Sequence, residues 1–294
     1  MVNTRVSDRP SEVRARQITP ADRDAVAAFL HKGFGRRRTR AYWQRAVDML
    51  AGREVPDGMP RFGYLIESNS RVVGAILVIS AMPRTGADPK AVRCSLSSWY
   101  VEPRFRIYAA MLASRALHHH GATHLNISPA ANTLPTLAVQ GYVRYCHGAF
   151  VACPLLARSK AAATVLAADR EPAVPFEAFE WKLLRDHAAS GCIAFWCATA
   201  ERAYPFVFRR RLAKGVLPCA QLIYCRDTSD VVRFSSLIGR HLVIRGCPLV
   251  IIDADGPMPG LPGFYLEGKP KYFKGPDRPR LGDLAYTEAA LFGI

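Results

Sequence analysis

The chain has 294 residues, half of them hydrophobic, and its 40 basic and 24 acidic residues give a formal net charge of +16. This length exceeds the usual size of a single hydrophobic core, which predicts two domains. The longest apolar runs are far shorter than the ~20 residues that a membrane span needs, and the N-terminal residues do not resemble a signal peptide. We therefore expect a soluble, cytoplasmic protein.

The eight cysteines form no C-x-x-C pair, and most of them lie in apolar runs. This pattern predicts free, buried thiols in a reducing compartment. The run His118-His119-His120 is interpreted as the last turn of a helix that ends before Gly121. Adjacent residues of a helix point in different directions, so three such side chains cannot converge on one ion. We predict no metal site.

The first elements can be followed in chain order. Residues 1–12 are polar and predict a flexible arm, and residues 13–18 alternate as a strand does. Thr19-Pro20-Ala21-Asp22 has a Thr suited to the N-cap and a Pro suited to the first helical position, which predicts a helix start. The elements expected next are a helix over 42–50 and a hairpin of two strands over 63–66 and 72–80.

Residues 93–128 share their pattern with residues 218–253, at a constant offset of 125 residues. Each segment reads as a strand, a turn, a helix, a glycine and a second strand. Ala109, Leu112, Ala113 and Leu117 give the first helix an apolar stripe, and the second segment has apolar residues at the same positions. A strand–helix–strand unit of this length favours parallel pairing, so its repetition predicts a duplicated α/β domain.

The second half is expected to repeat the plan of the first. Residues 162–174 are interpreted as a helix end and linker, 176–188 as a helix, and 191–198 with 204–209 as a strand pair. Three short strands are expected over 264–266, 272–273 and 284–287. The predicted organisation is a flexible arm over 1–12, a first domain over 13–158, a linker over 159–175 and a second domain over 176–294.

Four motifs of the first half occur in a familiar order. They are R-Q-I-T-P-A-D at 16–22, E-S-N-S-R-V-V-G at 67–74, W-Y-V-E-P-R-F-R at 99–106, and the stretch from Asn132 to Gly141-Tyr142. Over residues 13–152 this order resembles the GNAT superfamily of N-acetyltransferases. The resemblance implies a mixed α/β sheet and two tandem GNAT-like acyl-CoA N-acyltransferase domains. It also implies acyl transfer from an acyl-CoA, with acetyl-CoA expected, by direct attack of an amine or hydroxyl on the thioester.

The resemblance implies that backbone N–H groups at the helix start after Val101 hold the pyrophosphate of coenzyme A, because orphan N–H groups and the helix dipole favour an anion. A backbone N–H near Val101 is expected to stabilise the oxyanion. The implied cofactor contacts are Tyr100, Val101, Arg104, Phe105, Arg106, Ile107, Tyr108, Ala109 and Asn132. No catalytic acid or base is assigned, and Glu102 is expected to face solvent.

The sequence departs from the family pattern at three places. The turn over 104–110 has no glycine, and Leu137 stands where the family often has a general-acid tyrosine. In the second copy, Asp227 and Asp230 lie in the corresponding turn and would repel a pyrophosphate. We therefore expect the first copy to bind the cofactor and the second copy not to bind it.

Basic residues gather in clusters, and one of them contains Arg36, Arg37, Arg38 and Arg40. Other clusters are Arg209-Arg210-Arg211 with Lys214, and the group Lys269, Lys271 and Lys274. Such clusters attract anions, and the family resemblance places the first cluster near the acceptor entrance. We therefore predict an anionic acceptor, either a small molecule or a carrier-bound group. The plainer alternative is a set of solvated arginines.

Two further functions remain open at this point. The first turn lacks the glycines of the family, and the second turn contains acidic residues. Both features would suit a pair of GNAT-like domains that has lost catalysis and serves as a binding or regulatory module. Fem-like transferases also pair two GNAT domains and bind aminoacyl-tRNA, which a net charge of +16 would suit. The sequence assigns no oligomeric state.

Overall fold

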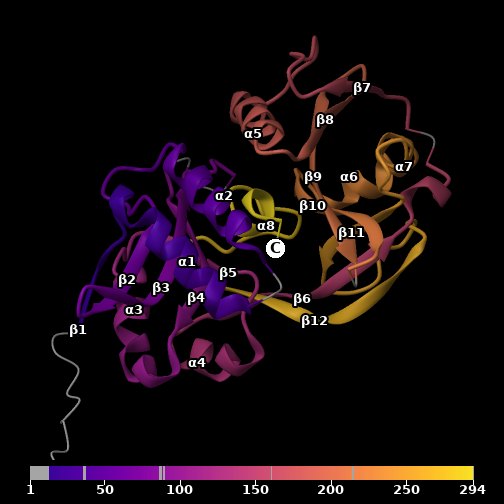
Figure 1. Ribbon diagram of the computed structural model, residues 1–294. Helices are drawn as coiled ribbons and strands as arrows, with labels where there is room; N and C mark the ends of the chain where they lie inside the picture. Colours follow the sequence, from indigo (N-terminus) through magenta and orange to yellow (C-terminus); the bar gives the residue numbers. More distant parts are fainter. Residues whose placement is uncertain are drawn as a thin grey trace, which may run out of the picture. The chain divides into compact units, whose positions relative to one another are not determined.

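The computed structural model describes residues 13–35, 38–85, 88, 90–159, 161–213 and 215–293 (Figure 1). The predicted arm over 1–12, and with it Arg36, Arg37 and Lys214, lies outside the described residues. The chain divides into two compact units, which we call unit 1 (Met1–Ser80 with Leu96–His120) and unit 2 (Ala81–Ser95 with Gly121–Ile294). The domain limits predicted from the sequence remain a prediction.

Unit 1 begins with the predicted order of strand, two helices and hairpin. These elements are β1 (Val13–Gln17), η1 (Pro20–Asp22), α1 (Arg23–Phe34), α2 (Arg40–Ala51), β2 (Gly63–Ser68) and β3 (Arg71–Ala81). β2 pairs antiparallel with both β1 and β3. The start of α1 is fixed by Asp22, whose carboxylate accepts hydrogen bonds from the Thr19 N–H at 2.8 Å and from the Arg16 guanidinium at 2.7 and 2.8 Å. The predicted Thr-Pro-x-Asp helix start is thereby confirmed.

Both copies of the predicted strand–helix–strand unit are present. The first consists of β4 (Arg93–Val101), η3 (Pro103–Tyr108), α3 (Ala109–Ala116) and β5 (Thr123–Asn126). The second consists of β10 (Leu217–Cys225), α6 (Thr228–Arg233), α7 (Ser235–Val243) and β11 (Leu249–Ala254). β4 is parallel to β5, with Cys94 opposite His124, and β10 is parallel to β11, with Cys219 opposite Leu249. Both registers differ by the same 125 residues, which confirms the repeat.

The last strands of the two copies are exchanged in unit 2. β6 (Val143–Ala152) follows the first copy along the chain but pairs antiparallel with β11 of the second copy. β12 (Gly263–Lys274) follows the second copy but pairs antiparallel with β5 of the first. β6 and β12 also pair with each other, so they run side by side in Figure 1. Within unit 2 the strand order is therefore β4-β5-β12-β6-β11-β10-β9-β8-β7.

The remaining elements of unit 2 are η4 (Ala131–Thr133), α4 (Leu134–Val139), η5 (Pro154–Leu156), β7 (Thr164–Ala167), α5 (Ala178–Ala189), β8 (Ile193–Ala198), β9 (Ala203–Ala213) and α8 (Glu288–Leu291). The helix expected over 176–188 and the strand pair after it are confirmed by α5, β8 and β9. Among the described residues, no helix is long and apolar enough to cross a membrane.

Four local predictions were wrong. Residues 164–167 form a strand rather than a helix end, because β8 offers them an antiparallel partner. The strands expected over 264–266 and 272–273 are one strand, β12. Residues 284–287 form a turn before α8, since Tyr286 adopts a left-handed backbone with φ of 58°. The three histidines follow α3, which ends at Ala116, instead of forming its last turn.

Two hydrophobic clusters form the core of unit 2. One contains Phe150, Phe206 and Ile252, together with Ile238 of α7. The other contains Val207, Ile223 and Leu284. Adjacent residues of β9, Phe206 and Val207, fall in different clusters because neighbouring side chains of a strand point to opposite faces. The two clusters therefore cover the two faces of the sheet.

A buried ion pair lies among the exchanged strands. Lys271 of β12 donates a hydrogen bond of 2.7 Å to Asp253 of β11, and the two side chains are only 7% and 4% exposed. Burial of either charge without its partner would carry a large desolvation cost. The pair therefore helps to fix where β12 lies.

We expect Asp253→Ala to lower the free energy of unfolding by ~3–5 kcal/mol, because it leaves the Lys271 ammonium buried and unpaired. The double variant Asp253→Leu/Lys271→Met should recover most of that loss, since it removes both charges. Urea denaturation of the three proteins measures both effects. Equal losses in the single and double variants would contradict this account.

Candidate functional site

The turn after β4 in unit 1 is held by Glu102. Its backbone N–H donates to the Val73 carbonyl at 2.9 Å, and its carboxylate accepts hydrogen bonds from Arg71 at 2.7 and 3.0 Å and from Lys32 at 3.1 Å. The Arg71 hydrogen bond is the main reason that the pKa of Glu102 falls to about 2. The expectation that Glu102 faces solvent was wrong, because Lys32 and Arg71 reach it from α1 and β3 and it is buried.

The predicted cofactor residues from Tyr100 to Ala109 lie on one continuous turn, at the end of β4 and the start of α3. Val101 and Phe105 are buried, whereas Arg104, Arg106 and Ile107 are exposed. Tyr108 directly precedes α3, and Ala109 is its first residue. Asn132 lies in η4 of unit 2, and its side chain is not described. Cofactor binding by these residues stays a prediction.

Tyr100 is packed into an aromatic group of unit 1. Its ring centroid lies 5.3 Å from that of Phe29 and 6.2 Å from that of Phe34. A Cβ atom at Gly33 would come within 2.2 Å of the Tyr100 ring, so only glycine fits there. The ring therefore fixes the last residues of β4 against α1.

The two copies differ at the helix that follows the turn. In the first copy, Glu102 stands at the N-cap of η3 but makes no side-chain cap, because its carboxylate is bound to Arg71 and Lys32. In the second copy, the Asp227 carboxylate accepts a hydrogen bond of 2.7 Å from the Ser229 N–H and caps α6. This bond is the main cause of the lowered pKa of Asp227. An anion at the second turn would have to compete with Asp227.

Of the four arginines predicted on the acceptor side, Arg38 and Arg40 are described. The Arg38 guanidinium lies 4.9 Å from the centre of the Tyr42 ring and 5.5 Å from that of Trp43, both within cation–π range. Arg40 is the exposed first residue of α2. Arg36 and Arg37 lie outside the described residues. Acceptor binding by the cluster remains a prediction.

A buried carboxyl group lies where β4 and β5 stop pairing in unit 2. The last paired residues are Ser95 and Leu125. Glu288, the first residue of α8, is fully buried there and accepts hydrogen bonds from the Ser95 hydroxyl at 2.5 Å and from the Ser128 hydroxyl at 3.0 Å. Burial raises the pKa of Glu288 above the ordinary value, although both hydrogen bonds oppose this shift. Sequence reasoning missed this residue, because no local pattern connects it to the two serines.

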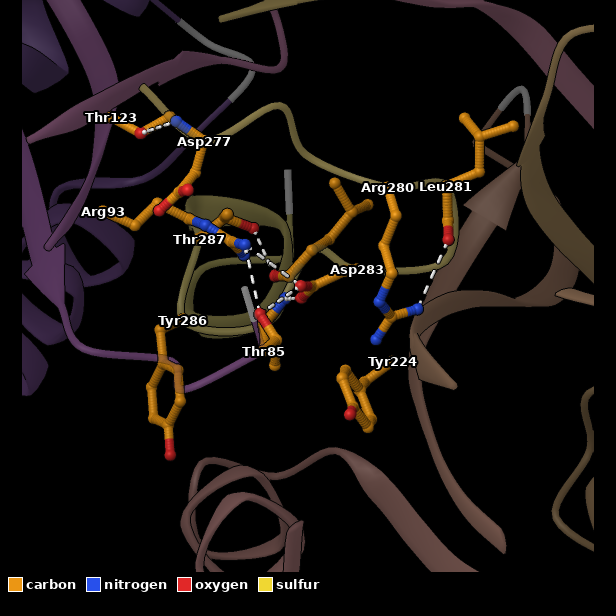
Figure 2. Close-up of polar contacts among 12 residues, drawn as sticks. Thr85, Arg93, Thr123, Tyr224, Asp277, Arg280, Leu281, Asp283, Tyr286 and Thr287 are labelled. Carbon is orange, nitrogen blue, oxygen red and sulfur yellow. Dashed lines mark hydrogen bonds and ion pairs between the residues drawn. The ribbon is translucent and has the colours of Figure 1, made fainter. Parts of the chain in front are cut away.

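The segment that carries Glu288 is anchored by Asp283 (Figure 2). The Asp283 carboxylate accepts hydrogen bonds from the Thr85 hydroxyl at 2.6 Å and from the Arg93 guanidinium at 3.1 Å. Burial opposes its ionisation, but the charges of Arg93 and Arg280 hold the pKa of Asp283 at about 2. Arg280 donates to the Cys225 carbonyl at 2.6 Å and lies 5.0 Å from the centre of the Tyr224 ring.

The rings of the three adjacent histidines lie close together, with centroids 5.6 Å apart for His118 and His120. The imidazole of His119 lies 3.0 Å from the Tyr64 hydroxyl, and burial lowers its pKa. No group of three or more His, Cys, Asp or Glu side chains suited to a metal ion occurs in the part of the chain that the structure describes.

The lowered pKa of Glu102 has a consequence for stability. Its ionised form stabilises the fold at pH values above the unfolded pKa of ~4.3, and this stabilisation is lost as the pH falls through about 2. Because the Arg71 and Lys32 side chains are 46% and 66% exposed, solvent screens the ion pairs, and we expect Glu102→Gln to cost only ~1–2 kcal/mol at pH 7. Urea denaturation between pH 7 and pH 3 should show the difference shrinking at low pH. The exposed Asp57→Asn variant is the control, and a pH-independent difference would exclude the ion pair as its cause.

Comparison of the sequence with protein-family models and with curated proteins finds no match. Solved structures do match. A GCN5-related N-acetyltransferase from Kribbella flavida is 15% identical with a TM-score of 0.56, over 89% of this chain and 70% of that chain. A probable N-acyltransferase from Enterococcus faecalis is 13% identical with a TM-score of 0.53, over 93% of this chain and 74% of that chain.

A third match is the GCN5-related glucosamine N-acetyltransferase region of a fungal multi-domain beta-N-acetylglucosaminidase. It is 9% identical with a TM-score of 0.58, over 91% of this chain and 38% of that longer chain. Identities this low show a shared fold. The resemblance predicted from four short motifs is therefore confirmed at the level of the fold: this chain has the mixed α/β fold of GCN5-related N-acetyltransferases.

Proposed function

We propose that the protein is an acyltransferase that moves an acyl group from an acyl-CoA to an amine or hydroxyl. Acetyl-CoA is the proposed donor, and the proposed acceptor is anionic. The shared fold supports acyl transfer in general, since the matched structures are named as N-acetyltransferases or N-acyltransferases. The donor and the charge of the acceptor rest on the residues of this chain.

The observation that carries the proposal is the difference between the two turns. The first turn presents a helix start without a side-chain cap, flanked by the exposed Arg104 and Arg106. A pyrophosphate can use free N–H groups, the helix dipole and guanidinium groups together. The second turn is capped by its own Asp227. We therefore propose one donor site, in the first copy.

Binding and activation of the thioester in this mechanism do not require an acidic or basic side chain. An amine attacks the thioester carbon, the C–N bond forms and the C–S bond breaks. The nitrogen loses one proton, and coenzyme A takes up one proton and leaves as a thiol. We propose that a backbone N–H near Val101 stabilises the oxyanion that forms during the attack, since a preorganised donor there strengthens as charge develops. Glu102 holds this stretch of backbone in place through its bonds to Arg71 and Lys32.

One observation favours a second candidate, a binding module without turnover. The turn has no glycine, and Phe105 fills its inner side as a buried ring. A bulky residue there limits how closely the backbone can approach a phosphate. Binding of coenzyme A without transfer of the acyl group would favour this candidate.

We expect coenzyme A to bind with a dissociation constant between micromolar and millimolar, because the glycines of the family turn are missing. Arg104→Ala and Arg106→Ala should each weaken binding by roughly 10-fold to 100-fold, the equivalent of ~1.5–3 kcal/mol for a charge-assisted phosphate contact. Calorimetry with Arg115→Ala as the control measures this, since Arg115 is an exposed arginine in the last turn of α3. An absence of binding at millimolar coenzyme A would refute the proposed donor site.

The arginine cluster predicts a salt-dependent rate. Neutralising Arg36, Arg37 and Arg38 together should slow the reaction with an anionic acceptor at low salt and have little effect at high salt, where screening has removed the steering. The stability of the triple variant is measured first. Equal losses at both salt concentrations would indicate a folding defect or a specific contact, and unchanged rates would leave the cluster a solvated surface.

A further inference from the structure

We propose that a pocket at the start of β4 binds the phosphate group of a small ligand, and that Arg93 supplies its principal hydrogen-bond donor. The pocket is formed by residues just before β4, by the first residues of β4 and β5, and by the segment after β12. All the residues that line it belong to unit 2. The inference does not rest on the proposed acyl transfer, because no residue of the proposed donor turn lines this pocket.

Arg93 has one guanidinium nitrogen without a partner. Its Nη2 donates hydrogen bonds to Asp283 at 3.1 Å and to the Thr85 hydroxyl at 3.2 Å (Figure 2). Its Nη1 is buried and makes no hydrogen bond to any residue that the structure describes. Burial of a polar group without a partner is costly, and more so when the group is charged. Because Arg93 lines the pocket, an oxygen atom of a bound anion can be that partner.

The neighbouring aspartates do not supply this partner. Oδ2 of Asp283 accepts hydrogen bonds from the Thr85 hydroxyl at 2.6 Å and from Arg93 Nη2. Oδ1 of Asp283 accepts a hydrogen bond from the Ala285 N–H at 3.2 Å. Asp277 attracts Arg93 through its charge but makes no hydrogen bond to it within the described part of the chain. Nη1 of Arg93 therefore remains available to a ligand.

The charges around the pocket favour an anion. Its lining contains four arginines and three aspartates, so positive charge is in excess: Arg84, Arg93, Arg278, Arg280, Asp88, Asp277 and Asp283. The buried Asp283 already forms an ion pair with Arg93. Arg84 and Arg278 are exposed, so their guanidinium groups can turn toward a ligand. Asp88 and Asp277 weaken the positive potential of the pocket without cancelling it.

A phosphate group suits this arrangement better than a carboxylate does. The arginines come from three segments: the residues before β4, β4 itself and the segment after β12. A carboxylate offers two oxygens in one plane, whereas the tetrahedral oxygens of a phosphate can bind guanidinium groups from several directions. The space in the pocket, with its open mouth included, is about 460 Å³, within the ~300–1,000 Å³ of small-molecule sites. The ligand is therefore free phosphate or a small phosphate monoester.

Arg84 has a strained backbone at this pocket. Its φ of 57° lies in the left-handed region, which glycine adopts readily and other residues adopt at a cost. Strained residues of this kind gather at functional sites. The arginine side chain thus offers the pocket a charge that glycine, the residue best suited to this backbone, cannot offer.

The second copy shows that the strand pair does not need these polar groups. At the constant offset of 125 residues, Arg93 corresponds to Pro218 and Thr123 corresponds to Pro248. β10 and β11 nevertheless keep the parallel register of β4 and β5. The Arg93–Asp283 pair explains the position of Nη2, but neither that pair nor the sheet explains the buried Nη1.

The test measures phosphate binding by calorimetry at physiological ionic strength, where the general attraction of a chain with a net charge of +16 is screened. Inorganic phosphate and glycerol 3-phosphate are the probes, and succinate is the carboxylate for comparison. The variants are Arg93→Lys, which keeps a charge beside Asp283, Arg84→Gly and Arg278→Ala. Arg240→Ala is the matched control, since Arg240 is an exposed arginine of α7 that does not line the pocket.

We expect the wild type to bind a phosphate probe and each pocket variant to weaken that binding by roughly 10-fold or more, as loss of a charge-assisted hydrogen bond does. Arg240→Ala should leave the affinity unchanged. Arg84→Gly should bind more weakly and yet be at least as stable as the wild type, because glycine relieves the backbone. Tighter binding of glycerol 3-phosphate would identify the ligand as a monoester, and tighter binding of inorganic phosphate would identify it as the free ion.

Three results would overturn the proposal: no binding of either phosphate at millimolar concentration, binding that the pocket variants leave unchanged, or equally tight binding of succinate. Chemical denaturation verifies that each variant is folded, and Arg84→Gly with Arg278→Ala decide the matter if Arg93→Lys is not. If Arg104→Ala abolishes phosphate binding and the pocket variants do not, phosphate binds at the donor turn and the pocket is refuted. A failure to bind coenzyme A would refute only the proposed function, since this assay contains none.

Discussion

The antiparallel pairing of β6 with β12 is the constraint on which the rest of unit 2 depends. β12 lies between β5 and β6, so the chain that ends the second copy must return to the first. The residues after β12 then reach the start of β4, where Asp283 meets Arg93 and Glu288 meets Ser95. A sheet without this exchange would leave the C-terminal segment with the second copy and the first copy without Glu288.

Buried charges are paired throughout this region. Lys271 with Asp253 and Arg93 with Asp283 are each within hydrogen-bond distance. Such pairs roughly balance their own desolvation cost, but an unpaired member would cost several kcal/mol. Their main effect is therefore on the specificity of the fold. A register shift of β12, or release of the C-terminal segment, would leave a buried charge without its partner. Glu288 differs, because hydroxyl groups rather than a guanidinium bind its carboxyl. Burial raises the pKa of this carboxyl, whereas the charges of Arg93 and Arg280 lower that of Asp283.

The two copies share one structural plan and differ in a few polar residues. Both keep the parallel strand pair at the same register, which is the part that the sheet requires. They differ at the turn after the first strand and at the position that Ser128 holds in the first copy and Asp253 in the second. Asp227 caps the second helix by itself, and Asp253 replaces the hydroxyl of Ser128 with a charge that Lys271 neutralises. The strand that follows the second copy, β12, pairs with β5 of the first, and the C-terminal segment contacts β4.

The sequence alone determined the local units of this protein. The apolar stripe from Ala109 to Leu117 and its repetition 125 residues later predicted both strand–helix–strand units, and the Thr-Pro-x-Asp motif predicted the first helix, because these patterns depend on neighbours along the chain. Four motifs were enough to predict the acetyltransferase fold.

Only the tertiary structure decided which strand pairs with which. The local sequences of β6 and β12 do not specify their partners, so long-range pairing makes the choice. The meeting of Glu288 with Ser95 and Ser128 follows from that choice, since side chains 193 and 160 residues apart leave no periodic trace. Glu102 is buried by different long-range contacts, with Lys32 of α1 and Arg71 of β3.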